Sequence, residues 1–537
     1  MIEKYREFFR EFIRPHTFTI ISLFLFSLLG MIFSLISPLL TRSLIDDVFI
    51  AKKTGLFLPI LFSFIAIYLI SAVSGYFSGY MSAKIGLTLF SEVSGDIFSA
   101  VQFAPLEKTE GMRTGDLLDR TINNVSPAVG IFTSIIPGFF MSAVRIVAPL
   151  FIMVSMNAKL TAIVMPPSFL ILLSSSFFGK RIKHKRRRSM DVFASLNSFL
   201  KEAFSIIPLT KVFGLEDHSE HRYGEEVSRY YDISMDATKT SLLSSAIGVL
   251  IAGLPSILLF AFGGSMVING SLTLGTLTAF MGYAALFLSP VSSISNLWIS
   301  LKSSSAEFDR INEILELESA RMEENEVESG RIEFRDVWFS YGSKKVLEGF
   351  SCSFDRGLNY ITGENGAGKT TILKLICGLY QPEKGEITID GKRVSAGMRK
   401  NLSIVFSDPY LFDASIYENI RIGKTSASEK DVMEAARLAG VDDFVRRLHE
   451  GYDTPVGESG ARLSSGEKQR IALARALLRD ATILLLDEVT KSVDAESRRA
   501  INEAIANLGN EKTVIIVTHD ENEIVKGSNV IHLSPDL

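Results

Sequence analysis

Six long apolar runs dominate the first part of the chain, and charged residues gather between them. The runs cover roughly residues 18–41, 57–83, 128–155, 160–179, 242–268 and 274–301. Crossing the hydrocarbon core of a bilayer takes about 20 apolar residues in a helix. From Thr240 to Leu301 there is no Asp, Glu, Lys or Arg, and only the turn-like Asn269-Gly270-Ser271 interrupts the apolar character. The pattern predicts six membrane-spanning helices.

The pattern changes near Arg331, where short apolar stretches alternate with helical ones. Asn359–Thr362, Ile483–Leu486 and Val514–Val517 are short apolar runs typical of buried strands. We therefore predict a polytopic α-helical membrane domain over residues 1–327 and an α/β domain over residues 328–537.

Basic residues beside the apolar runs predict the orientation of the membrane domain. Seven Lys and Arg residues lie between Lys180 and Arg188, directly after the fourth run, and others precede the first. By the positive-inside rule, the N-terminus, the long connections 2–3 and 4–5 and the α/β domain are cytoplasmic. We expect an integral protein of a prokaryotic cell (inner) membrane, in contact with membrane lipids. Residues 2–13 predict either an amphipathic helix in the membrane interface or a continuation of the first spanning helix.

Composition narrows the possible classes of function. The chain has 56 basic and 60 acidic residues and a net charge of -4, and it lacks a basic domain, so we expect no nucleic-acid partner. Two cysteines, Cys352 and Cys377, exclude a disulfide scaffold. Arg145 lies inside the third apolar run, where a charge is costly. It is either a residue of a substrate pathway or a partner in an ion pair or hydrogen bond with another helix.

The clearest chemical motif follows the strand at Asn359–Thr362. The sequence from Gly363 to Thr370 reads G-x-x-x-x-G-K-T and leads into a predicted helix from Thr371 to Leu379. Its glycines let backbone N–H groups curl around phosphate oxygens. Lys369 neutralises the β- and γ-phosphates, and the Thr370 hydroxyl ligates Mg²⁺. The motif predicts binding of ATP and Mg²⁺.

A second motif ends the strand at Ile483–Leu486. Asp487 is placed to reach the metal, and Glu488, one residue later, is placed to polarise an attacking water. The strand at Val514–Val517 is followed closely by His519, which by itself is more often structural than catalytic.

Between these motifs, Leu463-Ser464-Ser465-Gly466-Glu467 resembles the signature of ATP-binding-cassette (ABC) proteins, usually written LSGGQ. The order of the motifs is similar to that family throughout residues 330–537. The whole chain resembles an ABC exporter half-transporter, in which a six-helix membrane domain precedes an ABC ATPase domain of the α/β P-loop NTPase class.

This resemblance implies roles for individual residues. Tyr341 would stack on adenine, Asp487 would organise Mg²⁺, and Glu488 would be the general base. His519 would contact the γ-phosphate, and the signature would contact the ATP held by the other subunit. The expected nucleotide-binding residues are Tyr341, Gly363, Asn365, Gly366, Gly368, Lys369, Thr370, Thr371, Ser464, Ser465, Gly466, Glu467 and Asp494.

In the membrane domain the resemblance implies two coupling regions. Thr114–Arg120 resembles the stretch leading to the first coupling helix, and Lys211–Glu216 resembles the stretch near the second. Gly270–Gly275 resembles the outer turn before the sixth helix.

The chain departs from the family pattern at three positions. Ser407 stands where a Gln usually reaches Mg²⁺, and serine is too short for the same direct contact, although a water could bridge. Ser465 adds a Cβ where glycine is usual. Glu467 puts a carboxylate near the γ-phosphate end, partly offset by a helix N-terminus.

These features leave alternatives open. The leading hypothesis is ATP-driven export of a hydrophobic or amphipathic substrate by alternating access, as a dimer of half-transporters. The altered signature is compatible with a homodimer and with a heterodimer. The alternative function is a nucleotide-binding regulatory half of an asymmetric heterodimer, with little activity of its own. Fusion of the two domains on one chain disfavours an importer.

Overall fold

The computed structural model describes residues 2–317, 327–489, 495–509 and 511–533. The chain divides into two compact units. The first holds residues 1–99 and 114–316, and the second holds residues 100–113 and 317–537. Residues 100–113, which lie between the second and third apolar runs, therefore belong to the same unit as the α/β region. The single boundary predicted after residue 327 does not include this stretch in the α/β domain.

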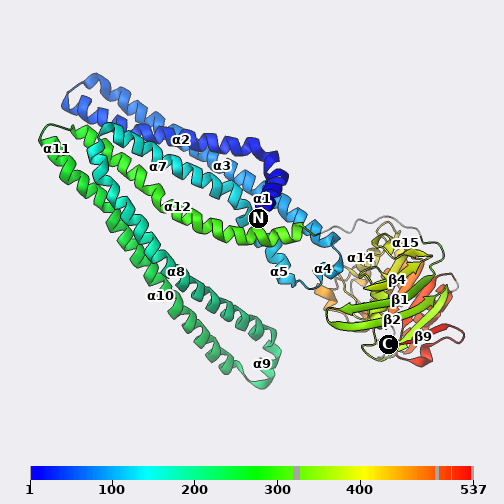
Figure 1. Ribbon diagram of the computed structural model, residues 1–537. Coiled ribbons are helices and arrows are strands. Elements are labelled where there is room, and N and C mark those ends of the chain that lie inside the picture. Colours follow the sequence, from blue (N-terminus) through cyan, green and yellow to red (C-terminus); the bar gives the residue numbers. More distant parts are fainter. Residues whose placement is uncertain (1, 318–326, 490–494, 510, 534–537) are drawn as a thin grey trace. The chain divides into compact units, whose positions relative to one another are not determined.

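All six predicted apolar runs are helical in the first unit, hereafter the membrane unit (Figure 1). Four of them lie within one long helix each, whereas the run at 128–155 extends over three consecutive helical elements, and so does the run at 242–268. The long helices are α2 (Thr17–Ser43), α3 (Phe57–Phe103), α7 (Ile136–Met156), α8 (Ala158–Ser205), α10 (Glu216–Leu258) and α12 (Leu274–Leu315). The shorter elements are α1 (Ile2–Phe8), η1 (Phe9–Ile13), η2 (Arg14–His16), η3 (Leu44–Ile50), η4 (Thr54–Leu56), α5 (Thr114–Leu118), η5 (Asp119–Asn123), α6 (Val125–Gly130), η6 (Ile131–Ile135), α9 (Ile207–Phe213), η7 (Leu259–Gly263) and α11 (Gly264–Ile268).

Four helical stretches within the described residues are long and apolar enough to cross a membrane. They are Lys4–Ile50, Thr54–Phe103, Thr114–Met156 and Glu216–Ile268. A fifth is obtained if Phe177–Ser205 and Ile207–Phe213, bent by 67°, count as one span, and Leu274–Pro290 is a shorter apolar helix. For the runs at 160–179 and 274–301, a membrane span therefore stays a prediction, and so does the total of six spans.

Helices α8 and α10 form a long hairpin whose tip is α9 (Figure 1). Proline near its start and the left-handed Gly214, at φ 62°, bound the short tip helix. Val212 and Phe213 expose 80% and 66% of their surface there. An apolar tip of this kind is a surface that a partner could cover, at the place where the sequence predicts the second coupling region.

The N-terminal segment packs against protein. Phe8, Phe12 and Ile13 are buried, and the Tyr5 ring stacks on Phe308 of α12 with centroids 4.2 Å apart. Part of the apolar face of residues 2–13 therefore packs on the membrane unit, while Phe9 stays 47% exposed. The choice between an interfacial helix and a continuation of the first spanning helix stays a prediction.

The second unit, hereafter the ATPase unit, contains two sheets. The antiparallel sheet has the order β2-β1-β4-β5, and the parallel sheet has the order β6-β7-β8-β3-β9. The strands are β1 (Ile332–Tyr341), β2 (Lys344–Phe354), β3 (Gly357–Gly363), β4 (Lys384–Ile389), β5 (Lys392–Arg393), β6 (Leu402–Val405), β7 (Ile483–Asp487), β8 (Thr513–Val517) and β9 (Asn529–Leu533).

The parallel sheet is buried on both faces, because its strands alternate between two cores. Ile483 and Leu485 of β7 point into a core shared with β1, β2 and α13. Leu484 and Leu486 point into a core shared with the helices that follow β6. The helices of this unit are α4 (Leu106–Thr109), α13 (Lys369–Ile376), η8 (Ala396–Asn401), α14 (Ile416–Arg421), α15 (Glu429–Leu438), α16 (Asp442–Val445), η9 (Gly451–Asp453), η10 (Glu458–Gly460), α17 (Ser465–Leu478), α18 (Ala495–Leu508) and η11 (Glu521–Glu523).

Candidate functional site

Three neighbouring parallel strands deliver the candidate residues to one edge of the sheet. β8 lies between β3 and β7, and Val517 pairs with both Ile361 and Asp487. The carboxyl ends of the three strands therefore meet, and ligands of open α/β sheets bind at such edges. The loop after β3, the Asp-Glu pair at the end of β7 and His519 after β8 all lie there.

The loop between β3 and α13 can be built only with glycine at two places. Gly363 has φ 143°, and a Cβ there would lie 2.3 Å from the carbonyl oxygen of Leu533. Gly368 has φ 93°, and a Cβ there would lie 2.9 Å from Val346 Cγ1. Backbone N–H groups of such a loop, followed directly by the N-terminus of α13, form a site for an anion.

Lys369 places its ammonium group inside this loop. Its Nζ donates to the carbonyl oxygens of Gly363 and Glu364, at 2.8 Å each, and the residue is only 6% exposed. A buried cation beside converging N–H groups would neutralise the negative charge of bound phosphates.

Thr370 and Asp487 form the oxygen-rich part of the site. The Thr370 hydroxyl donates to Asp487 Oδ2 at 2.8 Å. Asp487 is 2% exposed, and burial, together with the negative charge of Glu488, raises its carboxyl pKa. Among the described residues, no three His, Cys, Asp or Glu side chains come together to hold a metal ion. A hydroxyl and one carboxylate suit Mg²⁺, which is usually completed by phosphate oxygens and water.

Glu488 and His519 form the third part of the site. His519 Nε2 lies 2.7 Å from Glu488 Oε1. Glu488 has φ 51°, a conformation that is uncommon for any residue with a side chain. Backbone strain of this kind often accompanies a functional constraint. The carboxylate could accept a proton from a water that attacks a phosphate bound in the loop.

Sequence reasoning missed Gln469, which connects two of these segments. It is 4% exposed, and its Nε2 donates to the Ser407 carbonyl oxygen at 3.2 Å and lies 3.5 Å from the Glu488 carbonyl oxygen. Its Oε1 has no hydrogen-bond partner among the described residues. The sequence signal that could have identified Gln469 is a polar residue among the buried positions of α17. Ser407 is thus held through its backbone, and its side chain is exposed.

The signature residues form the start of α17. Ser464 is the N-cap, and its N–H and hydroxyl both donate to Glu467 Oε2 at 2.8 Å, which makes a capping box. Ser465 and Gly466 open the helix. No hydrogen bond or ion pair within the described residues joins Ser464 or Glu467 to the phosphate-binding loop.

The remaining predicted residues are distributed as follows. Tyr341 ends β1, and its ring meets Tyr380 edge-on, with centroids 5.3 Å apart, and lies 5.7 Å from Lys374 Nζ. Asn365 is exposed and Thr371 is buried. Asp494 lies outside the described residues.

Residues 100–113, between the second and third apolar runs, belong to the ATPase unit and contact Tyr380, a neighbour of Tyr341. Glu110 hydrogen-bonds the Tyr380 hydroxyl and lies 3.8 Å from Lys374 Nζ. Glu107 Oε1 accepts from the Gln381 N–H at 2.7 Å. These contacts come from residues just before Thr114, and the coupling resemblance of Thr114–Arg120 stays a prediction.

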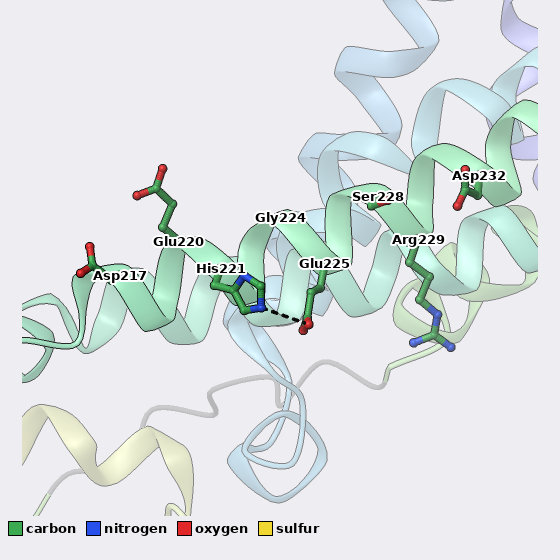
Figure 2. Close-up of a pocket in the computed structure, with 8 residues that line it drawn as sticks. All are labelled: Asp217, Glu220, His221, Gly224, Glu225, Ser228, Arg229 and Asp232. Carbon is green, nitrogen blue, oxygen red and sulfur yellow. Dashed lines mark ion pairs between the residues drawn. The ribbon is translucent and has the colours of Figure 1, made fainter.

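Figure 2 shows a different feature, an open polar strip along α10. His221 pairs with Glu225 at 3.5 Å. All eight lining residues come from one helix and recur at helical spacing: Asp217, Glu220, His221, Gly224, Glu225, Ser228, Arg229 and Asp232. The strip is a solvated helix face, and it shares no residue with the site built above.

Comparison with known proteins gives the same order of domains. The family model for the ABC transporter transmembrane region matches residues 20–291, and the family model described as ABC transporter matches residues 347–491. A Bacillus subtilis protein with the provisional name multidrug export ATP-binding/permease protein is 28% identical, over 97% of this chain and 93% of its own length.

Two further comparisons extend this result. The ATP-dependent lipid A-core flippase of Desulfotalea psychrophila is 30% identical, over 92% of this chain and 88% of its own length. A solved structure of a bacterial Atm1-family ABC exporter with ATP bound superposes with a TM-score of 0.81 at 22% identity, over 97% of this chain and 94% of that one. These matches confirm the predicted fold class.

Proposed function

The chain belongs to the ABC transporter family, and on that premise we propose that two copies of it export an amphipathic, negatively charged lipid. The coarser activity follows from the family: the protein is an integral membrane protein whose ATP hydrolysis is coupled to transport. The dimer, the substrate and the role of each site residue are our proposals.

Within the site, we assign each step to the residues that geometry brings together. The loop and Lys369 hold the phosphates of ATP, and Thr370 and Asp487 hold Mg²⁺, which supplies charge neutralisation at the phosphate oxygens. Glu488 orients and deprotonates the attacking water, and His519, 2.7 Å from its carboxylate, fixes the position of that carboxylate. Tyr341 is the proposed adenine contact.

The observation that carries the dimer is that the signature residues, within the described part of the chain, bond each other and form no hydrogen bond or ion pair with their own phosphate-binding loop. Ser464 and Glu467 bond each other, and in a head-to-tail pair they would face the ATP bound by the other copy. The apolar tip at Val212 and Phe213 would then be covered by that copy. A homodimer is our first proposal, and a heterodimer is the alternative. The paired Glu488 and His519 argue against a purely regulatory subunit.

Arg145 supports the choice of a charged lipid. It lies on the exposed surface of α7, and no ion pair joins it to another of the described residues. A cation within an apolar segment needs a partner, and the negatively charged headgroup of an amphipathic substrate would supply one. Relatives named as lipid A-core flippases agree with this substrate class.

We propose the orientation of the protein in the membrane, and its cellular location, from the sequence pattern. The N-terminus and the ATPase unit would be cytoplasmic, in a prokaryotic cell membrane, because the basic run at Lys180–Arg188 follows a predicted span directly.

Proteoliposomes test this function. We expect ATP-dependent movement of a fluorescent phosphatidylglycerol between leaflets, which Glu488→Gln abolishes. Arg145→Ala should slow phosphatidylglycerol and leave fluorescent phosphatidylcholine unaffected, while Arg229→Ala, on the strip of α10, should slow neither. If Arg145→Ala moves phosphatidylglycerol as fast as the parent protein does, the proposed substrate class is contradicted.

A further inference from the structure

The chain passes between its two units at three places. These are residues 99/100, 113/114 and 316/317. Any movement of the ATPase unit can reach the membrane unit through these covalent connections. The second and third connections enter the membrane unit at α5 and leave it at the end of α12, almost two hundred residues apart in sequence.

Four charged residues join these two entry points. Asp116, in α5, accepts from Arg310 at 2.5 Å through Oδ1 and from Arg120 Nε at 2.8 Å through Oδ2. Arg120 also donates to Glu313 Oε2 at 2.7 Å and to the Arg310 carbonyl oxygen at 3.0 Å. Asp116 lies three residues after one connection, and Glu313 lies three residues before another.

The cluster is more than a set of surface ion pairs. The Arg120 side chain is only 14% exposed and that of Asp116 is 30% exposed, so solvent screens this pair less than a free surface pair. The side chains of Arg310 and Glu313, at the rim of the cluster, are 40% and 62% exposed. Arg120 binds one carboxylate on each helix and a backbone carbonyl. A planar guanidinium held at three points restricts rotation as well as separation.

The end of α12 is also held by the N-terminal segment. The stacked pair Tyr5–Phe308 and the ion pair between Lys4 and Glu316, at 2.9 Å, bracket Arg310 and Glu313 along the helix. With α1 bound there as well as α5, the end of α12 is anchored at both places, so its local bending is opposed.

We propose that Asp116, Arg120, Arg310 and Glu313 form a brace that makes the second and third connections move as one. The proposal rests on the proposed function, since only an ATP-driven transporter needs such transmission. Without the brace, a displacement of residues 100–113 would be absorbed by bending of α5, and α12 would not follow. The four residues are positioning residues and do not touch ATP.

Hydrogen exchange of the full chain in nanodiscs tests the brace. In the Glu488→Gln background, exchange is compared with and without ATP–Mg²⁺ in the helices of the membrane unit. The variants are Asp116→Arg, Arg310→Asp and the double charge exchange, with the milder Arg310→Gln in case the reversals fail to fold. The matched control exchanges Lys185 and Asp236, a 2.7 Å ion pair between α8 and α10.

The parent should show ATP-dependent changes in both units. Each single variant should keep the ATP-dependent change in hydrogen exchange in the ATPase unit. In the membrane unit, the ATP-dependent change should be smaller by about five-fold or more, which is the lower end of usual coupling factors. The double exchange should restore it, and the control exchange should leave it intact. Full ATP-dependent changes in the membrane unit of the single variants would overturn the brace alone. No change in the membrane unit of the parent would overturn the proposed function together with the brace.

Discussion

Removal of the Asp390 carboxylate should destabilise the ATPase unit. The side chain, in the turn between β4 and β5, gathers the backbone leading into β1. Its Oδ2 accepts from the N–H groups of Glu328, Ser329 and Gly330 at 2.8, 3.0 and 3.2 Å. Its Oδ1 accepts from the Arg331 N–H at 3.0 Å and from the Ser329 hydroxyl. The carboxylate thus fixes the point where the chain enters the sheet.

The expected loss follows from these contacts. A hydrogen bond to a charged group is worth about 1.5–3 kcal/mol when water is excluded. Water replaces many of the lost partners at this partly exposed site, so the whole set should be worth about 2 kcal/mol. For a domain of about 200 residues, that lowers the melting temperature by about 4–8 °C.

Thermal unfolding of the intact chain in nanodiscs measures this loss, with Asp390→Ala compared with Asp355→Ala. Asp355 pairs with Arg331 at 3.3 Å and is 65% exposed, so its removal should cost little.

The effect also depends on pH. Hydrogen bonds from Ser329 and the backbone outweigh burial and lower the pKa of Asp390. A lowered pKa in the folded state means that the stabilisation is complete above the unfolded value of about 3.9 and is lost as the pH falls through the folded value. The difference between parent and Asp390→Ala should therefore be constant near neutrality and shrink in acid. A melting temperature equal to that of Asp355→Ala, or a difference that grows in acid, would refute this reasoning.

Two further predictions concern the signature and the thiols. Glu467→Gln keeps an oxygen that can cap Ser464, and it removes a negative charge that we place near the partner's ATP. The apparent KM for ATP should therefore fall about five-fold, as about 1 kcal/mol of repulsion implies. A steady-state titration with ATP measures the KM, and an unchanged or higher KM would contradict that placement. Burial raises the pKa of Cys352 and Cys377 to about 12. Iodoacetamide at pH 8 should therefore label neither thiol in the folded protein and both thiols after denaturation. Mass spectrometry counts the labels, and rapid labelling of the folded protein would contradict this prediction by showing that the thiols are accessible.

The parts of the site that could be predicted from sequence are those that depend on local geometry. Gly363 and Gly368 announce their loop because no other residue fits their backbone angles and close contacts. Asp487 and Glu488 follow a short apolar run whose length favours a strand buried on both faces, as β7 is. Chain-local signals of this kind need no knowledge of the tertiary fold.

The parts that escaped prediction depend on residues distant in sequence. Gln469 acquires its position only when α17 packs beside Ser407 and Glu488. Arg120 meets Glu313 across almost two hundred residues. Residues 2–13 have an amphipathic pattern that fits lipid and protein equally well, and nothing local in the sequence indicates that Tyr5 stacks on Phe308.

The most direct test of the whole account is the ATPase activity of this chain purified alone in lipid nanodiscs, with Glu488→Gln as the matched control. We predict Mg²⁺-dependent hydrolysis that the single substitution reduces at least about 100-fold, as expected for loss of a general base, while ATP binding is retained. Activity that persists in Glu488→Gln would contradict the assigned catalytic residue. Absence of activity in the parent, with ATP still bound, would contradict the homodimer and require a different partner chain.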